Sequence, residues 1–530
     1  MKGHPKGLIA AALSNMGERF GYYIMNAVLV LFLCSKFGLP EEKATLIYSI
    51  FYMGIYILSL VGGIIADRTQ NYKGTIQSGL LVMATGYIIL AIPILATAAN
   101  INWLLPLTCC ALFLIAFGNG LFKGNLQAIV GQMYDNFEAE AAKQGPEALA
   151  VAKGKRDSGF QIFYMFINVG GLIAPFVAPL LRSWWLGQNG FAYNADLPAL
   201  CHQCIATGAA MAPEAMTKMV ELFASMHVAI DPTAIAATQD TCQNYLNVFN
   251  TGVHYSFIAS VCAMLISLCI FLCTKKRFPT PAKKAAAESV SYTPEEKLAM
   301  AKELKQRLYA MFAVLIIAVF FWFSFHQNGT SMSLFARDFV NTESLAPEIW
   351  QAVNPFFVIV LTFPIMWLFE GLTRKGKGIS TPKKIAIGMG IAACAYLIMT
   401  IFCNVNGYPS ATDFKALPVE QAAPMKAAPY ILIVYYFFMT VAELFISPLG
   451  LSFISKVAPK NLLGLCQGLW LGATAVGNGF LWIGPLLYNK FPIWTAWIVF
   501  MSVCLISMIV MLCMVKWLER VTGEKVQLQK

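Results

Sequence analysis

Twelve apolar stretches, each long enough to cross a lipid bilayer, restrict this chain to one class of structure. A helix needs about 20 apolar residues to span a hydrocarbon core of roughly 30 Å. Only 12% of the 530 residues are charged, whereas soluble domains have about 25%. The sequence therefore predicts an all-α polytopic membrane protein. We expect its transmembrane helices near residues 8–34, 44–66, 75–98, 102–130, 157–181, 254–273, 308–332, 349–369, 382–404, 428–454, 464–488 and 493–517.

The basic residues predict the orientation of these helices. With both termini in the cytoplasm, most of the 38 Lys and Arg fall on cytoplasmic stretches, as the positive-inside rule requires. We therefore attribute the net charge of +11 to topology and expect no nucleic-acid partner. The first apolar stretch contains Glu18 and Arg19, so we interpret it as a membrane helix and not as a cleaved signal peptide. We expect an integral protein of a bacterial inner (plasma) membrane.

The twelve segments divide into two sets of six. Residues 274–307 form a polar linker between an N-terminal half, residues 1–273, and a C-terminal half, residues 308–530. We interpret the charged end of the linker, from Pro294 to Arg307, as a solvated tether, with an amphipathic surface helix as the alternative. Two six-helix halves around a central cavity are typical of major facilitator transporters, which bind substrate near the membrane midplane.

The loop between the second and third segments supports this fold class. Residues 62–74 contain a Gly-rich helix end followed by Asp67 and Arg68, and they resemble the cytoplasmic signature of the major facilitator superfamily. Glycines allow close helix packing, and Asp67 can pair with basic groups across a gate. We therefore expect Asp67 and Arg68 to act in gating.

The outer loop between segments 5 and 6, residues 182–253, is unusually long. Its Ala- and Met-rich part, residues 205–237, is compatible with helix, and we interpret the loop as an outer cap or an inert insertion. The loop holds Cys201, Cys204 and Cys242. A disulfide or free thiols are the favoured states of these cysteines, and a zinc site is the weaker alternative. We expect no metal and no cofactor.

Ionisable residues inside the membrane segments are the candidate functional residues. Each costs about 2.5–3.5 kcal/mol at the bilayer centre, so they usually face a polar interior. Helical periodicity places a polar face on the first segment; it comprises Asn15, Glu18, Arg19, Tyr22 and Tyr23. The alternative is a structural ion pair that holds the first helix against a neighbour.

The membrane charges differ in sign between the halves. Glu18, Arg19 and Lys123 give the first half a net positive charge, and Glu443 gives the second half a negative one. A cavity between the halves would be cationic on one wall and anionic on the other. Charge-assisted hydrogen bonds at both walls suit a zwitterion with separated ends. The pattern predicts an amino acid or short peptide as substrate, since a sugar has no need of it.

Four stretches resemble the proton-dependent oligopeptide transporter family, and the resemblance covers nearly the whole chain. Residues 18–23 (Glu-Arg-Phe-Gly-Tyr-Tyr), 118–125, 163–171 and 443–450 are similar, in order, to its signatures in segments 1, 4, 5 and 10. The resemblance implies import of di- and tripeptides, with protons, by alternating access.

The resemblance also implies roles for individual residues. By analogy, Arg19 and Lys123 bind the peptide carboxylate. Glu443, with Asn168 and Asn354, binds the peptide amino group. Further positions that line such pockets are Tyr22, Tyr23, Tyr56, Ser447 and Trp470.

Two departures from the family pattern concern proton coupling. The first Glu of the segment-1 motif is Asn15, and the expected Glu of segment 7 is His326. A histidine can act as a proton switch near neutral pH, or it can be a neutral hydrogen-bonding residue at the gate. Coupling, if present, is expected to run through Glu18, His326 or Glu443.

Other functions remain as alternatives. A non-coupled peptide facilitator, or a major facilitator transporter for another small zwitterion such as an amino acid, fits the same charges. We expect no enzyme, because neither a His-Glu-x-x-His nor a Gly-x-Ser-x-Gly motif occurs. The expected partners are peptides, protons and the lipid bilayer, and a monomer is compatible with the sequence.

Overall fold

The structure, a computed structural model, describes residues 4–97, 99–194, 197–280, 294–329, 331–341, 352–417, 419–459 and 462–523. Nearly all of these residues are helical. The first half contains α1 (Leu8–Phe37), α2 (Glu41–Thr69), α3 (Tyr72–Ala91), α4 (Ile101–Gln144), α5 (Pro146–Gln188), α6 (Leu197–Thr207), η1 (Gly208–Ala210), α7 (Pro213–Ser225), α8 (Ile235–Thr274) and η2 (Lys275–Arg277). The second half contains α9 (Pro294–Phe325), η3 (His326–Gly329), α10 (Ser331–Phe339), α11 (Val353–Arg374), α12 (Thr381–Val405), α13 (Ala411–Ala416), α14 (Val419–Met425), α15 (Tyr430–Val457), α16 (Leu463–Asn478), α17 (Ile483–Lys490) and α18 (Ile493–Val521).

The number of spans is slightly smaller than expected. In the described part of the chain, ten helices are long and apolar enough to cross a membrane. The two parts of α1, bent by 42° near residue 27, make an eleventh. The eleventh expected segment, residues 464–488, is divided, because α16 ends at Asn478 and α17 begins at Ile483. The polytopic all-α fold class is confirmed, and the unbroken helix expected over residues 464–488 is wrong.

Several helices continue beyond the predicted membrane boundaries. α4 and α5 extend to a single connecting residue, Gly145, whose φ of 123° is accessible to glycine and strained for other residues. α9 begins at Pro294, so the charged end of the linker is the start of a transmembrane helix and not a tether. Residues 281–293 of the linker and residues 349–351 of the eighth expected segment lie outside the described residues.

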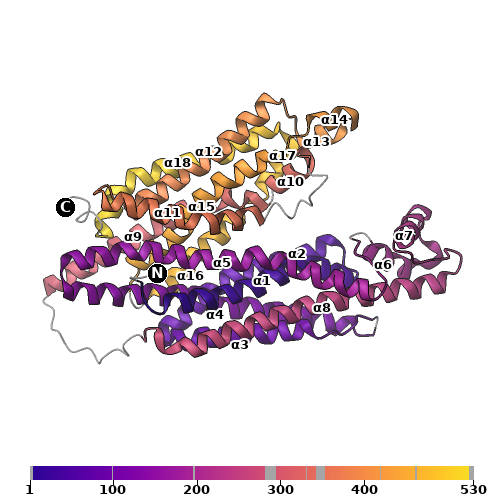
Figure 1. Cartoon of the computed structure of the whole chain (residues 1–530), viewed down its shortest axis with the longest axis horizontal. Coiled ribbons are helices and arrows are strands. Elements are labelled where there is room, and N and C mark those ends of the chain that lie inside the picture. Colours follow the sequence, from indigo (N-terminus) through magenta and orange to yellow (C-terminus); the bar gives the residue numbers. More distant parts are fainter. Residues whose placement is uncertain are drawn as a thin grey trace.

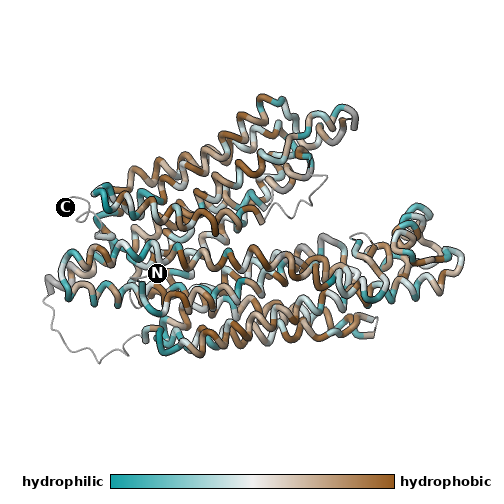
Figure 2. Tube along the Cα trace, in the orientation of Figure 1, coloured by the Kyte–Doolittle hydropathy of each residue, from teal (hydrophilic) through white to brown (hydrophobic). Residues whose placement is uncertain are grey.

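The chain forms two bundles that lie side by side (Figure 1). In the first half α1 packs on α8 and α5, and α3 packs on α4; in the second half α12 packs on α18 and α15. The halves meet mainly where α2 contacts α16 and where α5 contacts α11 and α15. The bundles lie closest near the linker and diverge toward α7 and α14 (Figure 1). Apolar residues dominate the long helices, while polar residues gather at their ends (Figure 2).

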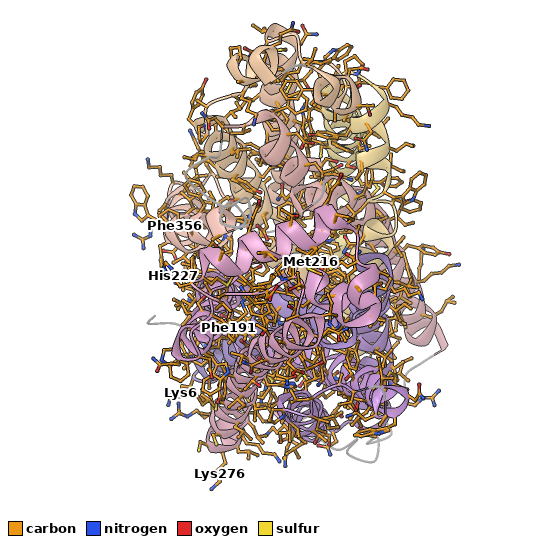
Figure 3. The ribbon with its side chains drawn as sticks, turned by 90° about the vertical axis from the view of Figure 1, so that its right-hand side faces the viewer. Lys6, Phe191, Met216, His227, Lys276 and Phe356 are labelled. Carbon is orange, nitrogen blue, oxygen red and sulfur yellow. The ribbon has the colours of Figure 1, made fainter. Side chains whose placement is uncertain are left out.

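The expected outer cap is a small helical subdomain. α6 and α7 come from the Ala- and Met-rich loop, and the first turns of α8 continue it. Figure 3 views the molecule from this end, with Met216 and His227 marking the cap helices in front. His202 of α6 attaches the cap to the first half, since its Nε2 lies 2.6 Å from the carbonyl oxygen of Ser35 on α1. Burial lowers the pKa of His202, so the neutral ring donates this hydrogen bond.

A close crossing of α2 and α4 gives the first prediction. A Cβ atom at Gly62 would overlap the carbonyl oxygen of Gly120, so Gly62→Ala must push two backbones apart. Overpacking of this kind costs about 1–3 kcal/mol, and we expect a lower melting temperature in detergent. Gly187→Ala is the matched control, because a Cβ there meets nothing within 4 Å. Equal melting temperatures for both variants would contradict this account of the crossing.

Candidate functional site

The acid and base near the start of the chain pair with each other. Arg19 on α1 donates two hydrogen bonds to Glu18, Nε to Oε2 and Nη2 to Oε1, each 2.6 Å long. Asn119 of α4 adds a third bond to Oε1, also 2.6 Å. Both charged side chains are at least 95% buried. A bidentate pair with a further donor offsets the desolvation of both ions. The ion pair lies within α1, and the bond from Asn119 is the contact that connects it to α4.

Lys123 is the cation of this region that has no counterion. It lies on α4, and its Nζ sits 4.9 Å from the centroid of the Tyr56 ring on α2. Among the described residues it forms no ion pair. An aromatic face stabilises an ammonium group by about 0.5–2 kcal/mol, which is less than a carboxylate would provide. Lys123 therefore retains capacity for an anion.

Glu443 of α15 is the buried anion of the second half. Asn354 of α11 donates to its Oε2 over 2.7 Å, and Tyr164 of α5 donates its hydroxyl proton to Oε1. Neutral donors thus solvate the carboxylate from both sides. No Lys, Arg or His in the described part of the chain forms an ion pair with it. Tyr164 belongs to the first half, so this hydrogen bond joins the two halves at the level of the site.

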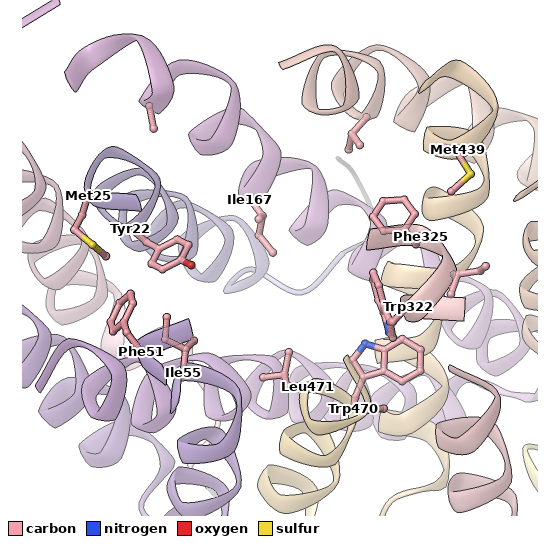
Figure 4. Packing of buried hydrophobic residues seen from close by; sticks show 14 of the residues in the cluster. Tyr22, Met25, Phe51, Ile55, Ile167, Trp322, Phe325, Met439, Trp470 and Leu471 are labelled. Atoms are coloured by element: carbon pink, nitrogen blue, oxygen red, sulfur yellow. The ribbon is translucent and has the colours of Figure 1, made fainter. Parts of the chain in front are cut away.

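Aromatic side chains flank the charged groups. Tyr22, Phe51 and Ile55 of the first half lie opposite Trp322 and Trp470 of the second half (Figure 4). The two tryptophans contact edge to face, with 6.4 Å between ring centroids.

His326, the first residue of η3, stacks on Trp322 at 5.1 Å between ring centroids. Its Nδ1 is buried and has no hydrogen-bond partner among the described residues. Aromatic packing against Trp322 and Phe325 holds the ring.

The remaining predicted site residues are less directly engaged. Asn168 donates to the carbonyl oxygen of Tyr164 one turn earlier on α5, and among the described residues it makes no hydrogen bond to Glu443. Ser447 is buried one turn after Glu443, and its hydroxyl has no hydrogen-bond partner in the described part of the chain. Tyr22 lies against the guanidinium of Arg19, 4.8 Å from ring centroid to Cζ, and Tyr23 packs against Tyr22.

Asp67 closes the linker end of the interface between the halves. Its carboxylate accepts the backbone N–H groups of Gly464, over 3.0 Å, and Leu465, over 2.7 Å. These groups open α16, and a helix N-terminus attracts negative charge. Tyr72 donates a further hydrogen bond. Arg68 is exposed and forms no ion pair with any residue that the structure describes.

A second carboxylate, Asp157 on α5, crosses the same interface. Lys384 of α12 and Lys456 of α15 lie 2.9 Å and 2.8 Å from its two oxygens. Ser452 adds a hydrogen bond of 2.6 Å. Next to it, Arg156 donates to the carbonyl oxygen of Ser455 in the second half over 3.2 Å. The halves are therefore joined at their linker ends by buried charge.

The sequence predicted no individual role for Tyr164, Asn119 or Asp157. Tyr164 and Asn119 stand within the quoted signatures of segments 5 and 4, but an aromatic or an amide within an apolar run gives no sign of its partner. Asp157 begins an expected membrane segment, where a charge looks like part of a solvated loop.

Two helical bundles with buried, oppositely charged groups between them define a transporter of the major facilitator type. The sequence profile of the POT family matches residues 73–293 and 282–493. The chain belongs to the POT family.

Relatives and solved structures agree with this assignment. The chain is 28% identical to the peptide transporter YePEPT of Yersinia enterocolitica over 497 residues, which cover 90% of this chain and 86% of that protein. It is 26% identical to dipeptide and tripeptide permease B of Shigella dysenteriae, covering 97% and 96%. A crystal structure of the peptide transporter POT with sulfate shares the fold at 21% identity, with a TM-score of 0.57 over 98% and 96% of the chains. So does a POT family transporter in complex with a thioalcohol-conjugated peptide, at 19% identity, a TM-score of 0.58 and 98% of each chain.

The contacts of Asp157 give the second prediction. In Asp157→Asn a neutral amide replaces the carboxylate that pairs with Lys384 and Lys456, and removing one partner of a buried ion pair costs about 3–5 kcal/mol. We expect the linker ends of the halves to separate. Spin labels at the exposed positions Val151 and Lys377 measure this separation as a longer distance.

Glu140→Gln is the control for that measurement. Glu140 pairs with Lys143 on the same helix, and both side chains are exposed, so their pair contributes about 0–1 kcal/mol. The control must leave the distance between the labels unchanged. An unchanged distance in Asp157→Asn as well would contradict the proposed role of Asp157 in joining the halves.

Proposed function

We propose that this protein imports di- and tripeptides, together with protons, by alternating access. One observation carries the proposal: Lys123 has no counterion on one side of the interface, and Glu443 on the other side is bonded by neutral groups alone. A zwitterion with separated ends satisfies both. The names of the relatives, a peptide transporter and a di- and tripeptide permease, support the choice of a peptide.

The peptide carboxylate binds Lys123 in this proposal, with Arg19 next to it. Because Glu18 already neutralises Arg19, Lys123 provides most of the attraction. The peptide ammonium group binds Glu443, where it replaces or joins the donors Tyr164 and Asn354. Tyr22, Tyr23, Tyr56, Asn168, Ser447 and Trp470 contribute apolar walls and further hydrogen bonds.

Alternating access follows from the contacts between the halves. In the described conformation Asp67 and Asp157 join the cytoplasmic ends, while the bundles diverge toward the cap (Figure 1). We assign this conformation to the outward-facing state. Release on the cytoplasmic side then requires both carboxylates to leave their partners, with residues 1–273 and 308–530 moving as two units and Arg68 acting beside Asp67 at the gate.

Three residues are the candidates for carrying the coupled proton. Glu18 is held by Arg19 and Asn119, which donate to both of its carboxylate oxygens. Glu443 has neutral donors only, and protonation would remove its attraction for Tyr164 of the opposite half. His326 has a buried Nδ1 beside the aromatic wall. We assign the coupling to Glu443 and His326, with Glu18 as the fixed partner of Arg19.

The proposed setting is an inner (plasma) membrane with both termini in the cytoplasm, and a monomer as the working unit. The asymmetry of Lys and Arg supports the orientation. A facilitator that carries peptides without protons is the second candidate, because Asn15 and His326 replace two family glutamates.

The direct test is uptake of labelled dialanine into proteoliposomes with and without an inward proton gradient. Accumulation above the outside concentration that requires the gradient is the expected result. Uptake that only equilibrates would favour the facilitator. Absence of uptake, with no competition by tripeptides, would overturn peptide transport and favour another zwitterion such as an amino acid.

The charged site gives the third prediction. Lys123→Ala and Glu443→Gln each remove a charge-assisted bond to one end of the peptide, worth about 1.5–3 kcal/mol. Uptake is therefore expected to fall by at least about 10- to 100-fold, toward the detection limit, in folded protein. Lys143→Ala is the matched control, because Lys143 lies on the same helix, α4, but is exposed. Normal uptake by either site variant would refute the site.

His326 gives the fourth prediction. His326→Gln keeps a hydrogen-bonding side chain but cannot carry a proton at physiological pH. We expect exchange of internal for external dipeptide to continue while gradient-driven accumulation is lost. If accumulation in this variant equals that of the unmodified protein, His326 is not a proton carrier.

A further inference from the structure

The three cysteines of the outer cap come together around one thiol. Cys201 and Cys204 lie on α6 and Cys242 lies on α8, and all three are fully buried. The thiol of Cys242 is adjacent to the thiols of both Cys201 and Cys204. The sulfur of Met219 on α7 lies 3.5 Å from Cys242 Sγ. The cluster thus joins all three helices of the cap.

The neighbouring histidine does not belong to this cluster. His202 stands between the two cysteines of α6 in sequence, but its Nε2 faces the carbonyl oxygen of Ser35, 2.6 Å away. Its Nδ1 lies near Gly38 on α1. His202 thus attaches α6 to α1, while the cysteines face α8.

We propose that Cys242 forms a disulfide bond with Cys201 that fastens α6 to α8. A bridge between Cys201 and Cys204 is disfavoured, because these residues are three apart on one helix and would have to distort it to pair. Cys242 is adjacent to both thiols, and Cys201 is the better-placed partner. Gln239 on α8 donates to the carbonyl oxygens of Cys204 and Ile205, and Tyr245 donates to that of Ala192. α8 therefore runs back along this segment, which places Cys242 beside the earlier turn that holds Cys201. The bridge closes a loop that contains α7, which restricts the unfolded cap.

The chemistry is a thiol–disulfide exchange with an external disulfide, either a protein disulfide or an oxidised low-molecular-weight thiol. The thiolate of Cys242 attacks the external disulfide and forms a mixed disulfide, and one thiol leaves. The thiolate of Cys201 then attacks the Cys242 sulfur, which releases the second thiol. The two cysteines lose two protons and two electrons, and the external disulfide is reduced to two thiols. Because the cysteines are buried in the folded cap, the exchange takes place before the cap packs.

The inference rests on the outer location proposed above, since disulfides persist in oxidising compartments. It does not depend on the transported substrate. Cys204 remains a thiol beside the bridge and is available as a substitute partner when Cys201 is removed.

The test is alkylation of the whole protein, purified without reductant and denatured in N-ethylmaleimide, followed by peptide mapping. Every cysteine of the 14 except Cys201 and Cys242 is expected to carry the label, and one cross-linked peptide pair is expected to contain both. Reduction before alkylation must label all of them. Complete labelling without reductant, or a bridge that joins Cys204 to Cys242, would overturn the proposal.

Variants test the existence of the bridge and the outer location of the cap separately. Cys204→Ser must keep the bridge, whereas Cys242→Ser must label fully without reductant. The exposed Ser225 at the end of α7 serves as a reporter of location. In intact cells, Ser225→Cys should react with a membrane-impermeant maleimide. If Ser225→Cys fails to react, the outer location is overturned, and the proposed bridge with it. If Ser225→Cys reacts but Cys201 and Cys242 are free thiols, the bridge alone is overturned.

Discussion

The pairing of Arg19 with Glu18 determines how charge is distributed in the membrane interior of this protein. Ions buried away from water must be paired or neutralised, and the two bonds of 2.6 Å cancel one charge of each sign on a single helix turn. What remains near the interface is the ammonium of Lys123 in one half and the carboxylate of Glu443 in the other. Each is held by neutral neighbours that solvate it less well than a counterion would, and this separated pair is what a zwitterionic substrate can complete.

Glu443 also connects the site to the arrangement of the halves. Tyr164 reaches it from α5. Seven residues before Tyr164, Asp157 on the same helix pairs with Lys384 and Lys456 of the second half. A change at Glu443 therefore acts on α5 through Tyr164, and α5 also joins the halves through Asp157. Transport requires such a connection, because a ligand shifts a conformational equilibrium only through contacts that differ between the states.

The sequence predicted those features that depend on composition along the chain. Lys123 and Glu443 stand out because a charge in an apolar run is rare, and the cap helices follow from an Ala- and Met-rich stretch. Contacts between distant residues could not be predicted: Tyr164 and Glu443 are 279 positions apart, and nothing local distinguishes Tyr164 from a packing aromatic. The break between α16 and α17 was missed because hydropathy does not register backbone hydrogen bonding. The start of α9 was misjudged because its charges suggested solvent, although Pro294 is a residue that commonly opens a helix.

The account depends most on the claim that the two ends of a peptide bind separate charges, and competition by end-blocked dipeptides measures this directly. Dialanine, N-acetyl-dialanine and dialanine amide would compete with labelled dialanine for binding to the purified unmodified protein and to purified Glu443→Gln, because this variant is expected to take up little substrate. We predict that both blocked peptides compete poorly with the unmodified protein. Glu443→Gln should no longer prefer dialanine to N-acetyl-dialanine. It should still prefer dialanine to dialanine amide. Equal competition by N-acetyl-dialanine and dialanine in the unmodified protein would contradict the account.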